Sequence, residues 1–428
     1  MVFLNYLYFA ILTLIAFTFV SGRSYTTKSI FNKDVRIRLN GPEAFWILTF
    51  STGLIALSVD NVINLMAIRL FVIEALCFIC LFRTQQSTVF SIPVGLYFLY
   101  IAWMIIGLSY SPSYNYGIRE ILKYLFPFLV VLCASAVVKE EEVYFKAIYG
   151  AVTIGIISLI FEFIPFIGKL LPGFWWYGTG VAVNYISLSV ICLTLSYFTK
   201  SRTKFAIFTI LFILPCFIWV FRTSIMGTFA AVSAFYFIKY QIKSLPIIFS
   251  LFIVGAVLVF TIPSLHEKMF KKESKRTLAD LQNNKISDED ISTNGREIIW
   301  EHLTSTLYKN NKLSGSGTGA VQQELYTTIV AGGVNAAHGD YVQILCDNGI
   351  IGLVMYISIY VFIFLHCFFL FLRTTQVPIK MASLMAGASI VGVATTLYSE
   401  NVVNYSMCTL SMPFGLYGML LGLLSRKE

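Results

Sequence analysis

Uninterrupted apolar runs of about 20 residues recur along the entire chain, and no other feature of the sequence restricts its fold as much. A run of this length crosses a hydrocarbon core of about 30 Å as an α-helix, which satisfies its own backbone hydrogen bonds. Hydrophobic residues make up 57% of the sequence and charged residues 12%, against about 25% charged residues in soluble domains. The sequence therefore predicts an all-α polytopic membrane protein.

The apolar runs predict about 12–13 transmembrane helices. These helices are expected at residues 3–21, 43–59, 62–82, 88–109, 119–138, 143–165, 179–198, 204–221, 225–239, 245–263, 341–371, 378–397 and 404–424. The first run lacks a basic n-region and a small-x-small cleavage site, so we interpret it as a retained helix rather than a signal peptide.

Basic residues gather in alternate connections between the predicted helices, and the other short turns are nearly free of them. This set contains Arg23, Lys28, Lys33, Arg36, Arg38, Arg83, Lys139, Lys200, Arg202, Lys204, Lys239, Lys243, Arg373, Lys380, Arg426 and Lys427. The positive-inside rule assigns it to the cytoplasm, which puts the N-terminus outside and the C-terminus inside. We expect a transmembrane bundle at 1–263, an extracytoplasmic loop with short amphipathic helices at about 264–340, and C-terminal transmembrane helices at 341–428.

The extracytoplasmic loop is electrically balanced, because residues 264–337 hold nine Lys or Arg and nine Asp or Glu. The formal charge of +9 therefore arises from the cytoplasmic connections, where it sets topology and meets anionic lipid. A nucleic-acid partner is not expected, since that role needs a basic face on a soluble module.

Two local patterns stand out in this loop. Residues 296–308 predict an amphipathic helix, because one stripe of the helix carries Ile299, Trp300, Leu303 and Leu307. The following glycine-rich turn, Ser314-Gly315-Ser316-Gly317-Thr318-Gly319, permits backbone geometries that other residues resist. It is neither a Walker loop nor a Rossmann fingerprint, because no Lys-Ser/Thr follows it and no strand precedes it.

Arg222 lies in Val220-Phe221-Arg222-Thr223-Ser224, at the outer ends of two short apolar segments. One interpretation is an arginine that snorkels to the lipid headgroups. The other is an anion site, because a guanidinium offers a planar fork of donors that matches phosphate oxygens. Arg296 is the second arginine that stands apart from the Lys-rich strip of the outer face, so the pair is a candidate anion site.

His338 opens the apolar helix that also carries Asp340 and Tyr341. A histidine at a helix start is often a cap or a packed ring. Near two fixed cations, however, an imidazole that titrates close to neutrality suits proton transfer from a hydroxyl that attacks a phosphorylated donor. We therefore predict His338 as the catalytic base.

These residues, and the arrangement of many helices around one large outer loop, resemble the bacterial O-antigen polymerase and O-antigen ligase superfamily. That superfamily comprises lipid-linked glycan enzymes of the C-type membrane glycosyltransferase architecture. The similarity rests on Arg222-Thr223-Ser224, Gly295-Arg296…Trp300, Gly315-x-Gly317-x-Gly319 and His338-Gly339-Asp340-Tyr341-Val342-Gln343…Asn348-Gly349-Ile350-Ile351-Gly352. The family usually has His-Asn where this chain has His338-Gly339, so any role of that amide is missing here.

The resemblance implies a metal-independent, inverting glycosyl transfer at the periplasmic face of the bacterial inner membrane, without a cofactor. The donor would be a glycan on undecaprenyl diphosphate and the acceptor a glycan or lipid-linked glycan, with room for a chain-length regulator as partner. In family members the His activates the acceptor hydroxyl and two arginines hold the diphosphate, which maps onto His338, Arg222 and Arg296. Asp340, Tyr341, Gly315 and Gly317 are expected in supporting roles.

Three alternatives stay open at this point. A ligase would move the finished glycan to lipid A-core or protein, and the motif around His338 favours the polymerase over it only slightly. A lipid-glycan flippase usually shows two related halves and ionisable residues near the midplane; this chain shows no internal repeat. A metal-dependent enzyme of the C type would carry paired acids in the first outer loop, and Asp60-Asn61 supplies one.

Overall fold

The computed structural model describes residues 2–51, 63–84, 88–164, 179–218, 221–270, 296–328, 336–405 and 409–425. Most of these residues are helical, and the expected all-α polytopic fold is confirmed. The helices are α1 (Val2–Ser21), α2 (Gly41–Ser51), α3 (Ile63–Arg83), α4 (Ile92–Leu108), α5 (Tyr114–Val137), α6 (Glu141–Phe163), α8 (Thr179–Phe198), α9 (Arg202–Ile218), α10 (Arg222–Tyr240), α11 (Leu245–Thr261), α12 (Pro263–Met269), α14 (Arg296–Leu303), α15 (Ala320–Thr327), α16 (Asp340–Arg373), α17 (Val377–Thr396) and α19 (Ser411–Ser425).

Each predicted apolar run coincides with a helix, with bounds that mostly differ by a few residues. The largest differences are at α19, which begins at Ser411, and at α2, whose described part ends at Ser51. The helix predicted at 296–308 is α-helical to Leu303 and continues as a π-helical turn over Thr304–Tyr308. Asp60, Asn61 and Gly295 lie outside the described residues.

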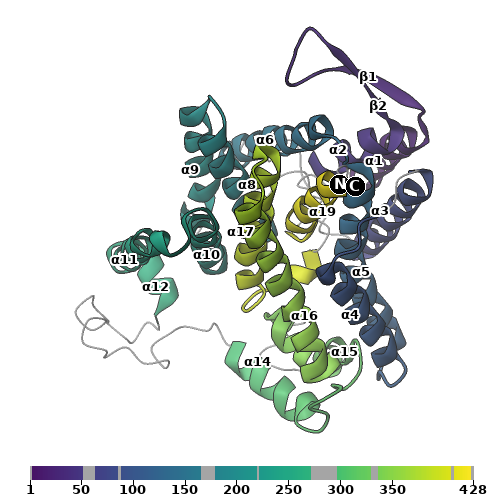
Figure 1. The fold of residues 1–428 in the computed structure, drawn as a ribbon. Coiled ribbons are helices and arrows are strands. Elements are labelled where there is room, and N and C mark those ends of the chain that lie inside the picture. Colours follow the sequence, from purple (N-terminus) through teal and green to yellow (C-terminus); the bar gives the residue numbers. More distant parts are fainter. Residues whose placement is uncertain are drawn as a thin grey trace.

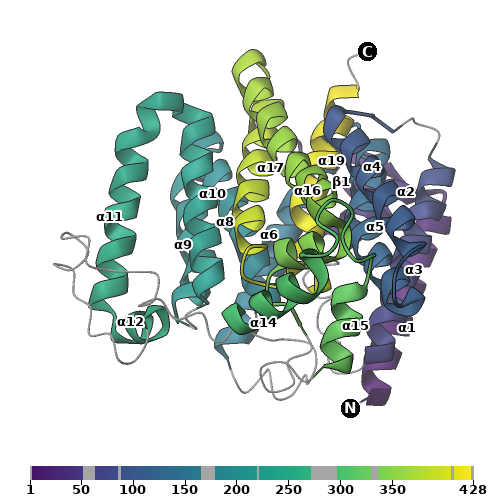
Figure 2. The same cartoon turned by 90° about the horizontal axis from the view of Figure 1, so that it is seen from below.

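Five helical segments of the described chain are long and apolar enough to cross a membrane. They are Tyr114–Val137, Glu141–Ile160, Arg222–Thr261, Asp340–Arg373 and Val377–Thr396, and the shorter apolar helices are Ile92–Leu108, Val183–Phe198 and Ser411–Ser425. The segment Arg222–Thr261 contains both α10 and α11, which run side by side in opposite directions (Figures 1 and 2).

The two chain ends lie at opposite ends of the helical bundle. Figure 2 shows the N-terminus at the same end as α12, α14 and α15, and the C-terminus at the other end. This arrangement agrees with an odd number of crossings. The compartment at each end remains a prediction from the charge pattern.

Helix α17 forms the centre of the bundle and packs against α8, α10, α16 and α19. It crosses α10 closely because both helices present a glycine: a Cβ on Gly227 would lie 2.9 Å from the carbonyl oxygen of Gly392. Small residues of this kind let membrane helices approach each other. The crossing brings the N-terminal end of α10, with Arg222, beside the chain that follows α17.

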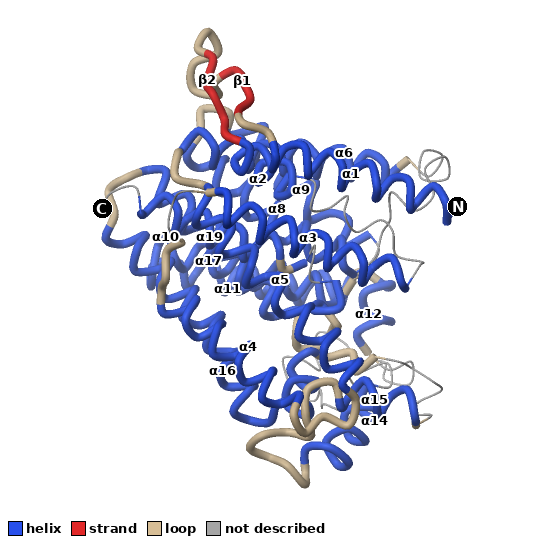
Figure 3. The backbone as a smooth tube through the Cα atoms, turned by 90° about the vertical axis from the view of Figure 1, so that its right-hand side faces the viewer, coloured by secondary structure: helices blue, strands red, loops and turns tan. Residues whose placement is uncertain are grey.

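A two-stranded antiparallel hairpin, β1 (Ser24–Lys28) with β2 (Arg36–Asn40), was not expected. It projects from the bundle near the C-terminal end (Figure 3). An Asx turn closes it, with the Asp34 backbone N–H donating to Asn32 Oδ1 at 3.2 Å. Glu142 of α6 contacts the turn end of the hairpin by accepting a hydrogen bond of 2.9 Å from Ser29 Oγ. The polar, basic composition of this segment conceals its strand pattern from an analysis based on apolar runs.

Candidate active site

Arg222 and Arg296 come together with Glu400, a carboxylate that the sequence analysis did not select. Arg222 is the first residue of α10 and Arg296 the first residue of α14. Arg296 Nη2 donates to Glu400 Oε1 at 3.0 Å, and Arg222 interacts electrostatically with both groups. The first N–H groups of a helix lack intrahelical partners and favour anions. The two guanidiniums and the first turns of α10 and α14 therefore lie around Glu400.

Glu400 is held where it can orient the arginines. Its Oε1 also accepts from Thr223 Oγ1 at 3.1 Å, and that hydroxyl lies 3.3 Å from Ser399 Oγ. The side chains of Arg296 and Glu400 are each only 17% exposed. A half-desolvated ion pair with an added hydroxyl donor is more rigid than an exposed pair. The three charged groups leave a net charge of +1, which suits an incoming anion.

His338 lies just before α16 with a backbone φ of 50°. This left-handed conformation is uncommon for a residue other than glycine and requires support from its surroundings. On one side, the Ala337 carbonyl accepts a hydrogen bond of 2.8 Å from Trp300 Nε1; on the other, the Asp340 N–H donates to Leu397 O at 2.9 Å. The backbone of His338 is therefore clamped between α14 and the end of α17.

The charge state of His338 depends on the same cluster. Burial lowers the pKa of His338 below its ordinary value of 6.5, the positive charge of Arg296 lowers it further, and the Glu400 carboxylate opposes both. The lowered pKa favours the neutral imidazole, which is the form that can accept a proton. The structure thus associates the predicted base with the two predicted anion ligands.

Asp340 and Tyr341 direct their polar groups to the backbone rather than to this cluster. Buried Asp340 accepts a hydrogen bond of 3.1 Å from the Val403 N–H, and the Tyr341 hydroxyl donates to Ala394 O at 2.8 Å. These contacts fix the start of α16, next to His338, against the end of α17 and the segment that follows it.

The glycine-rich turn is packed against the bundle. Gly315, Gly317 and Gly319 all have positive φ values, and a Cβ on Gly317 would lie 2.6 Å from the Ser111 backbone. The turn packs against the first part of α16. There Asp347 accepts hydrogen bonds from the backbone N–H groups of Gly319 and Val321 at 3.1 and 2.7 Å. These glycines permit close backbone packing, and their N–H groups are directed to protein acceptors.

Gly339, where the family usually has Asn, lies close to Trp300 and to Tyr398. Its φ of 176° is extended backbone that any residue adopts, but a Cβ would approach the Trp300 ring and the Tyr398 carbonyl at 3.0 Å each. In this chain Trp300 occupies the space beside His338 that a longer side chain at 339 would need.

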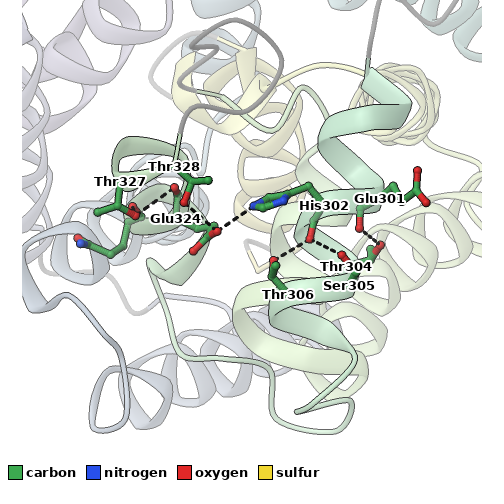
Figure 4. Close-up of polar contacts among 9 residues, drawn as sticks. Glu301, His302, Thr304, Ser305, Thr306, Glu324, Thr327 and Thr328 are labelled. Atoms are coloured by element: carbon green, nitrogen blue, oxygen red, sulfur yellow. Dashed lines mark hydrogen bonds and ion pairs between the residues drawn. The ribbon is translucent and has the colours of Figure 1, made fainter.

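A second histidine connects helices α14 and α15. Figure 4 shows the imidazole of His302, on α14, directed at Glu324 on α15. The Nε2–Oε1 distance is 2.8 Å, and Thr328 Oγ1 donates to the same oxygen at 3.1 Å. This contact places α15 directly beside the helix that carries Arg296.

Sequence reasoning missed Glu400, although a signal was available. The segment Tyr398-Ser399-Glu400-Asn401 is a polar break between two apolar runs, and its acid is the one charge in an otherwise uncharged turn. Within the described residues, no group of three or more His, Cys, Asp or Glu is arranged to hold a metal ion. Metal independence remains a prediction.

The fold and this cluster together define a multi-pass α-helical membrane protein with two clustered arginines and a histidine at one end. Residues 187–357 match the family model described as O-antigen ligase, which confirms the predicted resemblance to the O-antigen polymerase and ligase superfamily. The matched region contains Arg222, Arg296 and His338 and ends before Glu400. No curated protein matches the chain. The family implies a glycosyltransferase-like membrane enzyme whose substrates are a lipid-linked glycan and an acceptor.

Proposed function

We propose that this chain is a surface-polysaccharide polymerase that transfers glycan units from undecaprenyl diphosphate onto an acceptor glycan. The observation that carries the proposal is the convergence of Arg222, Arg296 and His338, which come from three distant segments, around Glu400. Transfer would occur at the periplasmic face of the inner membrane, where the loop domain at about 264–340 meets the helices of 1–263 and 341–428.

The proposed reaction is a single displacement. His338 takes the proton of the acceptor hydroxyl while that oxygen attacks the anomeric carbon of the donor from the side opposite the diphosphate. The bond between the anomeric carbon and the diphosphate oxygen breaks, and its electron pair leaves with undecaprenyl diphosphate. The anomeric configuration is therefore inverted. The imidazolium then gives its proton to water or to the departing diphosphate.

The arginines supply what a metal ion supplies in other enzymes of this chemistry. Charge grows on the leaving diphosphate, and two fixed guanidiniums stabilise it more strongly in a partly dry site than in water. We infer that Glu400 keeps Arg296 positioned before substrate arrives. The diphosphate then competes with the carboxylate for one guanidinium while Thr223 retains the carboxylate in place.

A ligase is the second candidate, because the matching family model is described as O-antigen ligase. The two activities differ in their products. Purified protein in nanodiscs, given lipid-linked repeat units alone, should yield a ladder of longer lipid-linked glycans if it is a polymerase. Products that form only after lipid A-core or an acceptor protein is added would establish the ligase instead.

The same assay tests the metal-free mechanism. Transfer should continue at an undiminished rate after strong chelation, because the diphosphate charge is neutralised by Arg222 and Arg296. Loss of turnover with chelator, restored by Mg²⁺ or Mn²⁺, would point to the acid-based enzyme class.

A further inference from the structure

Helix α15 presents a tyrosine pair at the same end of the molecule as the candidate active site. The rings of Tyr326, on α15, and Tyr116, at the start of α5, are stacked with their centroids 5.3 Å apart and their planes at 14°. The Arg119 guanidinium lies over the Tyr116 ring at 5.9 Å, within the range of a cation–π contact. Two segments that are 210 residues apart thus build one aromatic surface.

This surface is open in the described structure. Tyr326 is 54% exposed, although its ring is stacked on a neighbour, and the adjacent Asn115 and Arg119 are also exposed. Helix α15 has eight residues, among them Gln322, Gln323 and Glu324, so it is too short and too polar to span a membrane. A tyrosine on such a helix is not explained by the aromatic belt of transmembrane helices.

We propose that Tyr326, Tyr116, Asn115 and Arg119 form a glycan-binding platform for the oligosaccharide part of a substrate. The apolar C–H face of a sugar ring stacks on an aromatic ring, and its hydroxyls pair with planar amide and guanidinium groups. Arg119 contacts Tyr116, and Asn115 lies four residues before Arg119 on the same face of α5, so the group offers both kinds of contact. This inference rests on the proposed function, which requires long glycans at this end of the molecule.

The platform lies at a useful distance from the reacting groups. Arg296 begins α14, and His302 at the end of that helix contacts Glu324 of α15 at 2.8 Å. The six residues from Arg296 to His302 rise about 9 Å along α14, and α15 lies about one helix diameter, or 10 Å, to the side, so Tyr326 is on the order of 15 Å from Arg296. Only a chain of several sugars spans that distance, so the platform would bind a glycan away from its reacting end.

The test is direct binding of a lipid-free oligosaccharide, released by mild acid from the source strain's own surface polysaccharide. The protein is the full chain in nanodiscs, and affinity is measured by calorimetry. Tyr326→Leu keeps an apolar side chain against Tyr116 but removes the aromatic face, and should weaken binding about tenfold or more, equivalent to about 1.4 kcal/mol. Tyr326→Phe keeps the face and should bind within about twofold of the wild-type protein.

A matched control exists at the other end of the molecule. Tyr240 stacks on Tyr236 at the same interplanar angle of 14°, at the end of α10 remote from Arg222. Tyr240→Leu should leave oligosaccharide binding unchanged. Kinetics of Tyr326→Leu then identify the source of the glycan, because KM should rise for the acceptor if the acceptor lies on the platform and for the donor if the donor does.

Two results would overturn the platform. Wild-type affinity in Tyr326→Leu would show that the ring does not touch glycan. Weaker binding together with a matching fall in thermal midpoint would show that the ring only fastens α15 to α5. Binding is measured without turnover, so the catalytic proposal can fail separately: His338→Ala should bind the oligosaccharide normally even though it does not transfer it.

Discussion

His338 is the residue whose neighbours set both its backbone and its protonation. Trp300 and Leu397 hold the chain on either side of a left-handed φ, while burial and the charge of Arg296 lower the pKa of the imidazole. A merely structural histidine would need neither condition. Strain at one residue and a lowered pKa in the same side chain are typical of functional positions.

Replacing His338 should therefore affect turnover rather than binding. His338→Ala is expected to lose about two to four orders of magnitude in turnover, the usual contribution of a general base. His338→Gln can donate and accept hydrogen bonds but cannot carry the proton, so it should be nearly as impaired. Turnover and donor affinity should be compared at matched folded amounts. A nearly active Gln variant would assign His338 to positioning of the acceptor.

The pH profile should report the charges around His338. The deprotonated imidazole is the active form, so kcat/KM should fall as pH drops through a pKa below 6.5. Because the Glu400 carboxylate raises this pKa, Glu400→Gln should move the acid limb to still lower pH. The positive charge of Arg296 lowers the His338 pKa, so Arg296→Gln should raise it. Both pKa values can be measured by NMR of ring-labelled histidine. Shifts in the same direction in both variants would contradict the arrangement.

Arg222 should require its fork of donors and not only its charge. Arg222→Lys loses the bidentate geometry, and a lost hydrogen bond to a charged group costs about 1.5–3 kcal/mol, or about 10- to 100-fold in kcat/KM. Arg222→Ala should be worse while still inserting into the membrane. The measurement is kcat/KM for the lipid-diphosphate donor. A fully active Ala variant would make Arg222 a headgroup anchor.

At the level of helices and turns, the site depends on the break in α16. Gly349 interrupts this helix with a φ of 69° and a ψ of −172°, and a Cβ there would lie 2.1 Å from Leu313 O. The break allows the Ile350 and Ile351 N–H groups to bond the chain at Lys312 and Leu313, so the glycine-rich turn is locked to the start of α16. The first turn of α16 follows His338 directly.

A substitution at the break should loosen this part of the molecule. Gly349→Ala is expected to destabilise the protein by about 1–3 kcal/mol from backbone strain alone, seen as a lower midpoint of thermal inactivation. Gly95→Ala is the matched control, because it lies in helix α4 with no atom within 4 Å of the added Cβ. That change should be neutral or stabilising by about 0.5–1 kcal/mol. Equal effects of both would argue against a specific break.

For the complete protein, the testable property is topology. Helices α12, α14 and α15 lie at the N-terminal end of the bundle, opposite the C-terminus (Figure 2). Single cysteines at 296–328 should therefore react with an impermeant thiol reagent in intact cells once the outer membrane is made permeable. Cysteines at 23–38 should react only after the inner membrane is lysed. Labelling of both regions from one side would refute the charge-based orientation.

Much of this architecture follows from the order of the residues alone. A membrane helix needs only enough consecutive apolar residues, so the predicted runs coincide with helices over the described chain. A charged residue that interrupts such a run is costly in lipid and therefore conspicuous, which is why Arg222 could be selected. Arg296 and His338 were selected because they stand in the polar loop, at the start of an amphipathic and an apolar helix respectively. The family match to 187–357 covers the same three residues.

Other features depend on contacts between distant segments. Glu400 lies 62 residues beyond His338 and 178 beyond Arg222, and its partnership with Arg296 and Thr223 exists because Gly227 and Gly392 let α10 and α17 approach closely. The sequence predicted that the glycine-rich turn supports the site. Its close packing against the backbone of α4, α5 and α16 is visible only in the tertiary structure. Sequence spacing reports what neighbouring residues do within one helix. Which helix ends meet is set by packing, because side chains from all the helices compete for the same interior space.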